Sequence, residues 1–238
     1  MTTDSASSRV ISLPKPPGRH AKRPAVLPAD TRVLTDVLSA KPFDPAGTGF
    51  LLSLLPNSRS PVLWVQDRMS ARENGRLYTP GTQAFGLTQP ILHVTVSHPR
   101  DVLWAMEEGA ACAGLSAVVG EIHGQPAVLD FTATKRLALR SETSGVPVWL
   151  IRSGDTTGGL SAARERWRIG SLPSQMHPHD AQAPGAPRWD ADLFRARARP
   201  PAHWVAHYDR KDRLCLVSRT GDGTLESGEP ANQDVASR

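Results

Sequence analysis

The sequence predicts an α/β fold in which helices flank a mostly parallel sheet. Four short segments, at 62–66, 91–96, 117–121 and 147–151, have the length and composition of strands, and the apolar runs 62–66 and 117–121 are of the kind buried inside a parallel sheet. Segments with a helical spacing of apolar residues lie among them. Strands that alternate with helices form parallel sheets, because each crossover returns the chain to the same edge of the sheet.

Composition narrows the class of protein. The chain has 238 residues, 39% of them hydrophobic, with 21 prolines and 19 glycines, which fits one sizeable domain with poorly ordered ends. No stretch approaches the roughly 20 consecutive apolar residues of a membrane span, and the N-terminus lacks the apolar core of a secretory signal. We therefore expect a cytoplasmic protein without a membrane partner. We expect its two distant cysteines, Cys112 and Cys215, to be reduced and buried.

We divide the chain into five parts. Residues 1–28 form a polar, proline-rich tail that we predict to be disordered, and its first 25 residues hold five basic residues against one acid. The α/β core takes 29–172, a linker 173–187, a small antiparallel hairpin extension 188–220, and a second disordered tail 221–238. A basic tail attracts nucleic acid or an acidic protein surface, or stays solvated without a dedicated partner.

The first elements follow from capping and chain-breaking residues. Asp30 suits the N-cap of a helix over Thr31–Ala40, which has four apolar residues at helical spacing. Pro42 and Pro45 then break the chain, and an apolar helix follows over Gly47–Leu55.

The later elements repeat this logic. Pro99 suits the first turn of a helix, Asp130 suits an N-cap, and Gly145 suits the position just after a helix end. The predicted elements are, in order, a strand Val62–Gln66, a short helix Gln83–Leu87, a strand Ile91–Val96, a helix Pro99–Cys112, a strand Ala117–Glu121, a helix Phe131–Ser144 and a strand Pro147–Ile151.

The C-terminal third combines basic and aromatic residues. Residues 164–169, Arg-Glu-Arg-Trp-Arg-Ile, alternate as in an exposed edge strand. Basic residues interleaved with a tryptophan are also typical of sites that bind single-stranded nucleic acid by charge and stacking. Runs at 203–208 and 213–217 flank a polar turn at 209–212 and predict a hairpin. The candidate residues for contacts with DNA or a protein partner are Arg164, Arg166, Trp167, Arg168, Arg195, Arg197 and Arg199.

The turn that opens the helix at Gly47–Leu55 is a candidate nucleotide site. Helix N-termini favour anions, and a P-loop adds a lysine and a hydroxyl residue after its last glycine. Gly47 can be that glycine, but Thr48 then stands in the lysine position and Gly49 in the hydroxyl position. Glu121 ends an apolar strand, as the acid of a Walker B strand does. The alternative is an ordinary loop-to-helix turn with a solvent-facing glutamate, and no cluster of ligand residues indicates a metal site.

Several blocks of the sequence carry a resemblance to a known family. The most specific are Leu-Trp-Val-Gln-Asp-Arg at 63–68 and Leu-Trp-Ala-Met-Glu-Glu-Gly at 103–109. Further blocks lie at 43–50, 75–81, 117–121, 129–137 and 162–169. Together they resemble the ImuA family, RecA-like accessory proteins of SOS-induced mutagenic translesion synthesis in bacteria. The resemblance spans roughly residues 30–220, including the basic end at 188–218.

The resemblance implies a RecA-like core that acts as a non-enzymatic scaffold of an error-prone translesion polymerase complex in DNA damage tolerance. The implied partners are an ImuB-type polymerase homologue, an error-prone replicative-type polymerase and RecA. No catalytic residues and no cofactor are carried over. Three alternatives stay open: a RecA-type ATP-binding protein or ATPase that uses Gly47, Thr48, Gly49 and Glu121, a single-stranded DNA-binding protein, and an SOS regulator of cell division.

Overall fold

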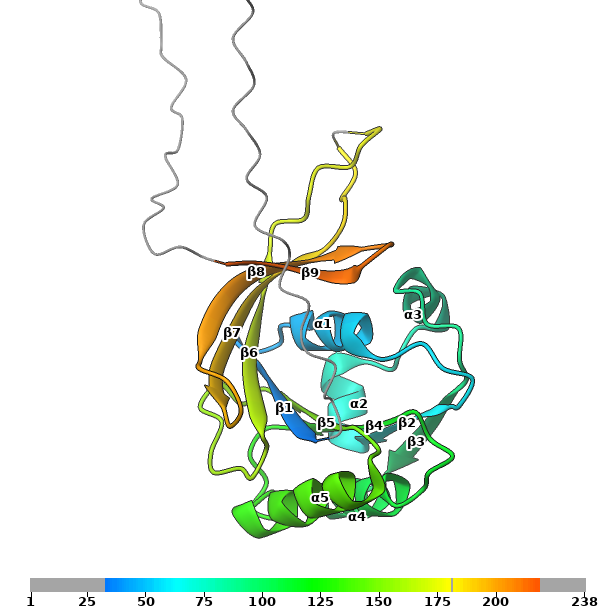
Figure 1. Ribbon diagram of the computed structural model, residues 1–238, viewed down its shortest axis with the longest axis vertical. Helices are drawn as coiled ribbons and strands as arrows, with labels where there is room; N and C mark the ends of the chain where they lie inside the picture. Colours follow the sequence, from blue (N-terminus) through cyan, green and yellow to red (C-terminus); the bar gives the residue numbers. More distant parts are fainter. Residues whose placement is uncertain (1–32, 181, 219–238) are drawn as a thin grey trace, which may run out of the picture.

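A single nine-stranded sheet forms the frame of the molecule (Figure 1). The computed structural model describes residues 33–180 and 182–218. The strands are β1 (Leu34–Ser39), β2 (Val62–Asp67), β3 (Ile91–Val96), β4 (Ala117–His123), β5 (Val148–Ser153), β6 (Glu165–Leu172), β7 (Arg188–Ala196), β8 (Ala202–Asp209) and β9 (Arg213–Ser218). The helices are α1 (Ala46–Leu54), α2 (Arg68–Asn74), α3 (Thr79–Ala84), α4 (Pro99–Ala110) and α5 (Phe131–Ser144).

The sheet has a parallel part and an antiparallel part. Its strand order is β3-β2-β4-β5-β1-β6-β7-β8-β9. All neighbours from β3 to β6 pair in parallel, and β6 to β9 pair antiparallel. The predicted α/β class, with a mostly parallel sheet and antiparallel C-terminal strands, is confirmed.

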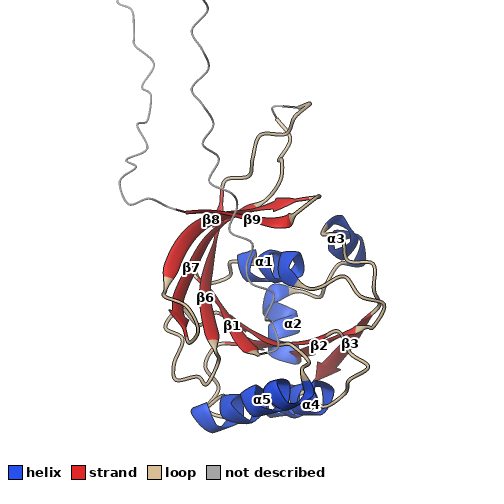
Figure 2. Cartoon of the chain, viewed as in Figure 1, coloured by secondary structure: helices blue, strands red, loops and turns tan. Residues whose placement is uncertain are grey.

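Helices cover both faces of the sheet (Figure 2). α4 and α5 lie together on one face, and α1, α2 and α3 lie on the other. The sheet curls around α1, so that β9 reaches the helix from the far edge. There, the Arg213 guanidinium donates to the carbonyl oxygens of Leu52 at 2.6 Å and Leu55 at 2.5 Å. A separate hydrophobic core fills each face.

The helix predicted over Thr31–Ala40 is wrong for its described part, which is the central strand β1. Every residue of β1 is buried, because parallel neighbours flank the strand and helices cover both of its faces. A strand buried on both faces loses its alternation of polar and apolar residues. The spacing of Leu34, Val37 and Leu38 therefore imitated a helix face.

The prediction of an exposed edge strand at 164–169 is also wrong. This segment belongs to β6, which lies between β1 and β7 in the interior of the sheet. Residues 173–187, which we predicted to be a linker between two units, connect β6 to β7 within one sheet. Met176 and Pro184 form a β-bridge within this connection.

Other local predictions are confirmed, some with shifted bounds. Asp130 caps α5 by accepting a hydrogen bond from the Ala133 N–H at 2.7 Å, and Gly145 ends the helix with a φ of 74°. The short helix expected at Gln83–Leu87 is misplaced, because the observed helix α3 spans Thr79–Ala84 and shares only residues 83 and 84 with it. Cys215 is buried as expected, whereas Cys112 is exposed.

Both terminal segments that we predicted to be disordered, and the predicted cap at Asp30, lie outside the described residues. Among the described helices, none has the length and apolar character required to cross a bilayer.

Candidate functional site: the carboxyl edge and the α5 groove

The predicted nucleotide loop lies where β1 ends and α1 begins. This is the carboxyl edge of the parallel strands, where open α/β sheets hold their ligands. The glycines of the loop serve packing there. A Cβ on Gly47 would lie 3.1 Å from Val37, and one on Gly49 would lie 3.2 Å from the Trp189 ring. Larger residues would push α1 away from the curled sheet.

The carboxylate of Asp44 lies at the N-terminus of α1, where it accepts hydrogen bonds from the chain itself. Asp44 Oδ1 accepts from the Ala46 N–H at 3.0 Å and from the Ser171 hydroxyl at 2.6 Å, and Oδ2 accepts from the Ser171 N–H at 2.8 Å. Partial burial opposes the shift, but these hydrogen bonds lower the pKa of Asp44. A negative charge therefore occupies the place where a helix N-terminus would attract a phosphate.

Glu121, the other residue of the predicted nucleotide site, is buried inside β4. Its carboxylate accepts from the side-chain amides of Gln66 and Asn74, each at 2.7 Å. Burial raises its pKa to about 7, although both hydrogen bonds favour the charged form. No hydrogen bond joins Glu121 to Gly47, Thr48 or Gly49, and the solvent-facing alternative for Glu121 is wrong as well.

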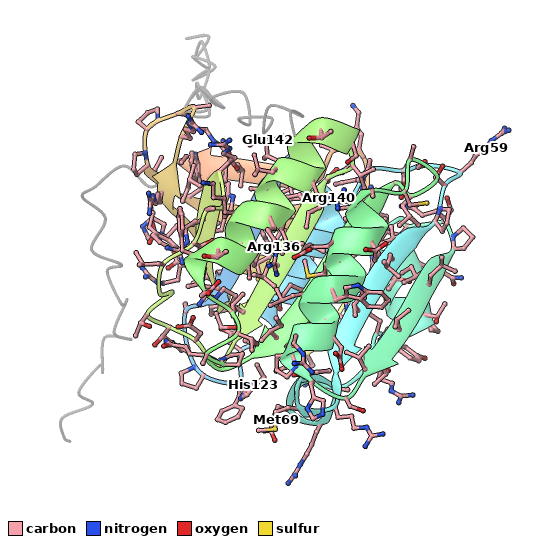
Figure 3. The ribbon with its side chains drawn as sticks, turned by 90° about the horizontal axis from the view of Figure 1, so that it is seen from below. Arg59, Met69, His123, Arg136, Arg140 and Glu142 are labelled. Atoms are coloured by element: carbon pink, nitrogen blue, oxygen red, sulfur yellow. The ribbon has the colours of Figure 1, made fainter. Side chains whose placement is uncertain are left out.

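The hydrogen bonds of Glu121 continue in both directions across the carboxyl edge. Toward the sheet edge, His93 Nε2 lies 2.7 Å from the Gln66 amide oxygen. Toward the surface, Asn74 donates to Ser153 at 2.6 Å, and the Ser153 hydroxyl lies 3.4 Å from His123 Nδ1. Figure 3 shows His123 and Met69 at this end of the molecule. The chain of polar groups thus joins β3, β2, β4, α2 and β5.

A second set of charged side chains lies on the face of the sheet opposite to Glu121. These side chains are buried and form ion pairs with one another. Arg152 forms an ion pair with Asp155 at 2.7 Å and lies 3.6 Å from Asp36, and Arg166 donates to the same Asp36 oxygen at 3.2 Å. Both arginines also donate to the Gly158 carbonyl. Two cations and two anions are thereby balanced, and they fasten the loop after β5 to the sheet.

The structure separates the seven predicted partner-binding residues into three groups. Arg166 and Trp167 are buried and present no surface to a partner. Three others are engaged with acids: Arg164 with Glu142, Arg168 with Asp192, and Arg199 with Glu165 through two hydrogen bonds of 2.8 Å.

Only Arg195 and Arg197 of the seven are exposed and lack an ion pair within the described chain. Both line a groove of about 560 Å³ beside α5, which we call the α5 groove. Its lining residues are Phe131, Lys135, Ala138, Leu139, Ser161, Ala162, Ala163, Arg164, Arg195, Ala196 and Arg197.

Sequence reasoning did not identify the α5 groove as a site. The available signal was the spacing of Phe131, Lys135 and Leu139, which recur every four residues and therefore share one side of α5. What the sequence did not show is that the ends of β6 and β7 lie against that side.

Within the described residues, no group of three or more histidines, cysteines and acids is arranged to hold a metal ion. Comparison of the chain with protein-family models and with curated proteins finds no match to either.

Proposed function

We propose that this chain is a non-enzymatic, RecA-like accessory protein that scaffolds an error-prone translesion polymerase complex through protein contacts. The resemblance to the ImuA family provides the partners: an ImuB-type polymerase homologue, an error-prone replicative-type polymerase and RecA. The mostly parallel sheet, with its glycine turn at the carboxyl edge, is the frame that this resemblance implies.

The Asp44 carboxylate at the start of α1 is the observation that carries the non-enzymatic part of the proposal. Its hydrogen bonds use the Ala46 N–H, and the Thr48 N–H donates to the Pro45 carbonyl at 3.1 Å. A nucleotide would need these donors free and a lysine for its outer phosphates. The loop supplies neither, and the charge of Asp44 repels a phosphate.

Exposed apolar side chains support the scaffold part. Trp104 and Val128 are 65% and 41% exposed, and both line one groove beside α4. Adjacent exposed apolar groups on a well-packed frame are typical of surfaces that contact other proteins.

One observation favours the ATP-binding alternative. Glu121 has a pKa near 7, which suits a general base at neutral pH. Its hydrogen bonds to Gln66 and Asn74 argue against that role, because both carboxylate oxygens are already engaged within the chain.

Nucleotide binding and partner binding, measured side by side on the purified full chain, test the proposal. We expect no saturable binding of a fluorescent ATP analogue, and we expect capture of both purified polymerase-type partners. A chain with Leu137→Ser, which disrupts the core at a fully buried position, serves as the control for fold-dependent capture. Saturable micromolar ATP binding, or capture that survives loss of the fold, would overturn the proposal.

A further inference from the structure

We propose that the α5 groove binds a short, acidic, amphipathic helix of a partner protein. This inference rests on the scaffold function proposed above and assigns it a surface and a partner chemistry.

The floor of the α5 groove is apolar and aliphatic. Alanines at 138, 162, 163 and 196 form much of it, and Phe131 and Leu139 stand beside them with 47% and 53% of their surface exposed. Leu160, next in sequence to the lining residue Ser161, is 75% exposed. Apolar side chains of a ligand would remove this surface from water, which is the main source of affinity in such grooves.

The rim of the α5 groove is basic. Lys135, Arg195 and Arg197 are exposed, and none of them forms an ion pair within the described chain. The fourth cation, Arg164, is paired with Glu142, and no acid lines the groove. A ligand with acidic residues flanking its apolar stripe therefore complements this surface, whereas a basic ligand is repelled.

The dimensions fit a helix. α5 has 14 residues, and at about 1.5 Å per residue its length is about 21 Å. A ligand helix of similar length can lie along it and place apolar residues, one turn apart, between Phe131 and Leu139. Figure 3 shows α5 lying at the surface, with Arg136, Arg140 and Glu142 labelled along it.

The lining favours a protein over a nucleic acid. Single-stranded nucleic acid binds by stacking successive bases on several aromatic rings. Phe131 is the one aromatic residue among those that line the α5 groove. The rest of its apolar surface comes from alanine and leucine, which have no flat ring on which a base can stack.

Selection from a displayed library of random peptides of about 16 residues tests this inference on the full chain. We expect the enriched peptides to be rich in Asp and Glu and to carry apolar residues at helical spacing. The strongest peptide, synthesised with a fluorophore, should bind at least about tenfold more weakly to the Arg195→Glu/Arg197→Glu variant. Arg59→Glu, the same kind of substitution at a single remote exposed site, should leave its affinity unchanged (Figure 3).

Several outcomes would overturn the inference: no enriched peptide, enrichment of neutral or basic peptides, or equal binding to the double variant. Binding of an oligothymidylate that displaces the peptide from Arg195 and Arg197 would assign the groove to nucleic acid instead. Because both arginines are exposed, the variant should keep its circular dichroism spectrum and unfolding curve. If the wild type captures the polymerase-type partners while the peptide test fails, this inference alone is lost, and the scaffold function stands.

Discussion

The carboxyl edge of the sheet and the α5 groove handle charge in opposite ways. At the carboxyl edge, Asp44 and Glu121 each accept hydrogen bonds from groups of the same chain. In the α5 groove, Lys135, Arg195 and Arg197 stay exposed without an acidic partner in the described chain. The candidate nucleotide site at the carboxyl edge therefore has its polar groups satisfied within the chain, whereas the cations of the α5 groove are open to a ligand.

The difference shows where a ligand has something to gain. A buried or partly buried polar group, charged or neutral, needs a partner inside the protein, because leaving it unsatisfied in a low dielectric is costly. A ligand that replaces such a partner gains little. An exposed cation beside apolar surface has no such partner to lose, so an acidic, apolar ligand gains both burial and charge pairing.

The largest effect that this comparison predicts is on stability. It concerns the buried ion pairs that Arg152 and Arg166 form with Asp36 and Asp155. Arg152→Met removes the ion-pair partner of Asp155 and one of the two ion-pair partners of Asp36, and both acids are fully buried. Asp155 keeps its hydrogen bonds from Gln125, Thr157 and Gly158, but breaking a buried ion pair on one side costs about 3–5 kcal/mol, because the remaining charge stays buried without its counter-charge. Urea unfolding followed by circular dichroism measures the loss in the free energy of unfolding.

Arg168→Met is the matched control for Arg152→Met. Arg168 pairs with Asp192 at 3.3 Å on the neighbouring strand β7, but about a third of each side chain is exposed, 35% and 33%. The expected cost is below about 1 kcal/mol, because solvent screens this pair. Equal losses for the two variants would mean that burial does not separate the two kinds of charge.

The next effect is a pH dependence of stability that arises from Glu121. Burial raises the pKa of Glu121 from its ordinary value of 4.5 in an unfolded chain to about 7 in the fold. The folded state therefore holds the proton over a pH range in which the unfolded state has released it. Stability should fall by about 3 kcal/mol as the pH rises through this window, since one pKa unit corresponds to about 1.4 kcal/mol.

The difference between the wild type and Glu121→Gln isolates this contribution, because other titrating groups cancel. Glutamine keeps the shape, and the Asn74 amide can turn to accept its new N–H while the Ser153 hydroxyl donates to Asn74. Unfolding free energies measured from about pH 4 to pH 8 should converge toward the acid end and diverge toward the alkaline end. Glu108→Gln on the exposed face of α4 should show no such trend, and a flat difference for Glu121→Gln would contradict the buried, neutral carboxyl.

Local chemistry explains why much of the fold was predictable from the sequence. The start and end of α5 follow from the Asp130 side chain and from the positive φ that Gly145 tolerates, and both act on their immediate neighbours. The apolar runs of β2 and β5 are short, and each follows directly on a proline, so their pattern predicts a strand.

The strand β1 and the two sites depend on contacts between distant parts of the chain, and local patterns do not contain them. Asp36 is tolerable inside a strand because Arg152 and Arg166, both far along the chain, reach it; Arg166 lies 130 positions later. Asp44 is fixed by Ser171, which is 127 positions away. The α5 groove likewise requires β6 and β7 to end beside α5. No spacing pattern in the sequence predicts these long-range contacts.

The smallest expected effect on stability is at Phe131 in the α5 groove, and it tests whether this side chain is part of the core. Phe131→Ser should lower the free energy of unfolding by only about 1 kcal/mol, because nearly half of the ring is already in water and only the buried remainder is lost. The same change at Leu137, which faces the core from the same helix and is fully buried, should cost about 3 kcal/mol or more. Urea unfolding of both variants measures this difference.

A large loss for Phe131→Ser would place its ring in the core, and the groove would then be part of the packing. A small loss, together with weaker binding of the selected peptide, is the combination expected of a side chain held in water until a partner covers it.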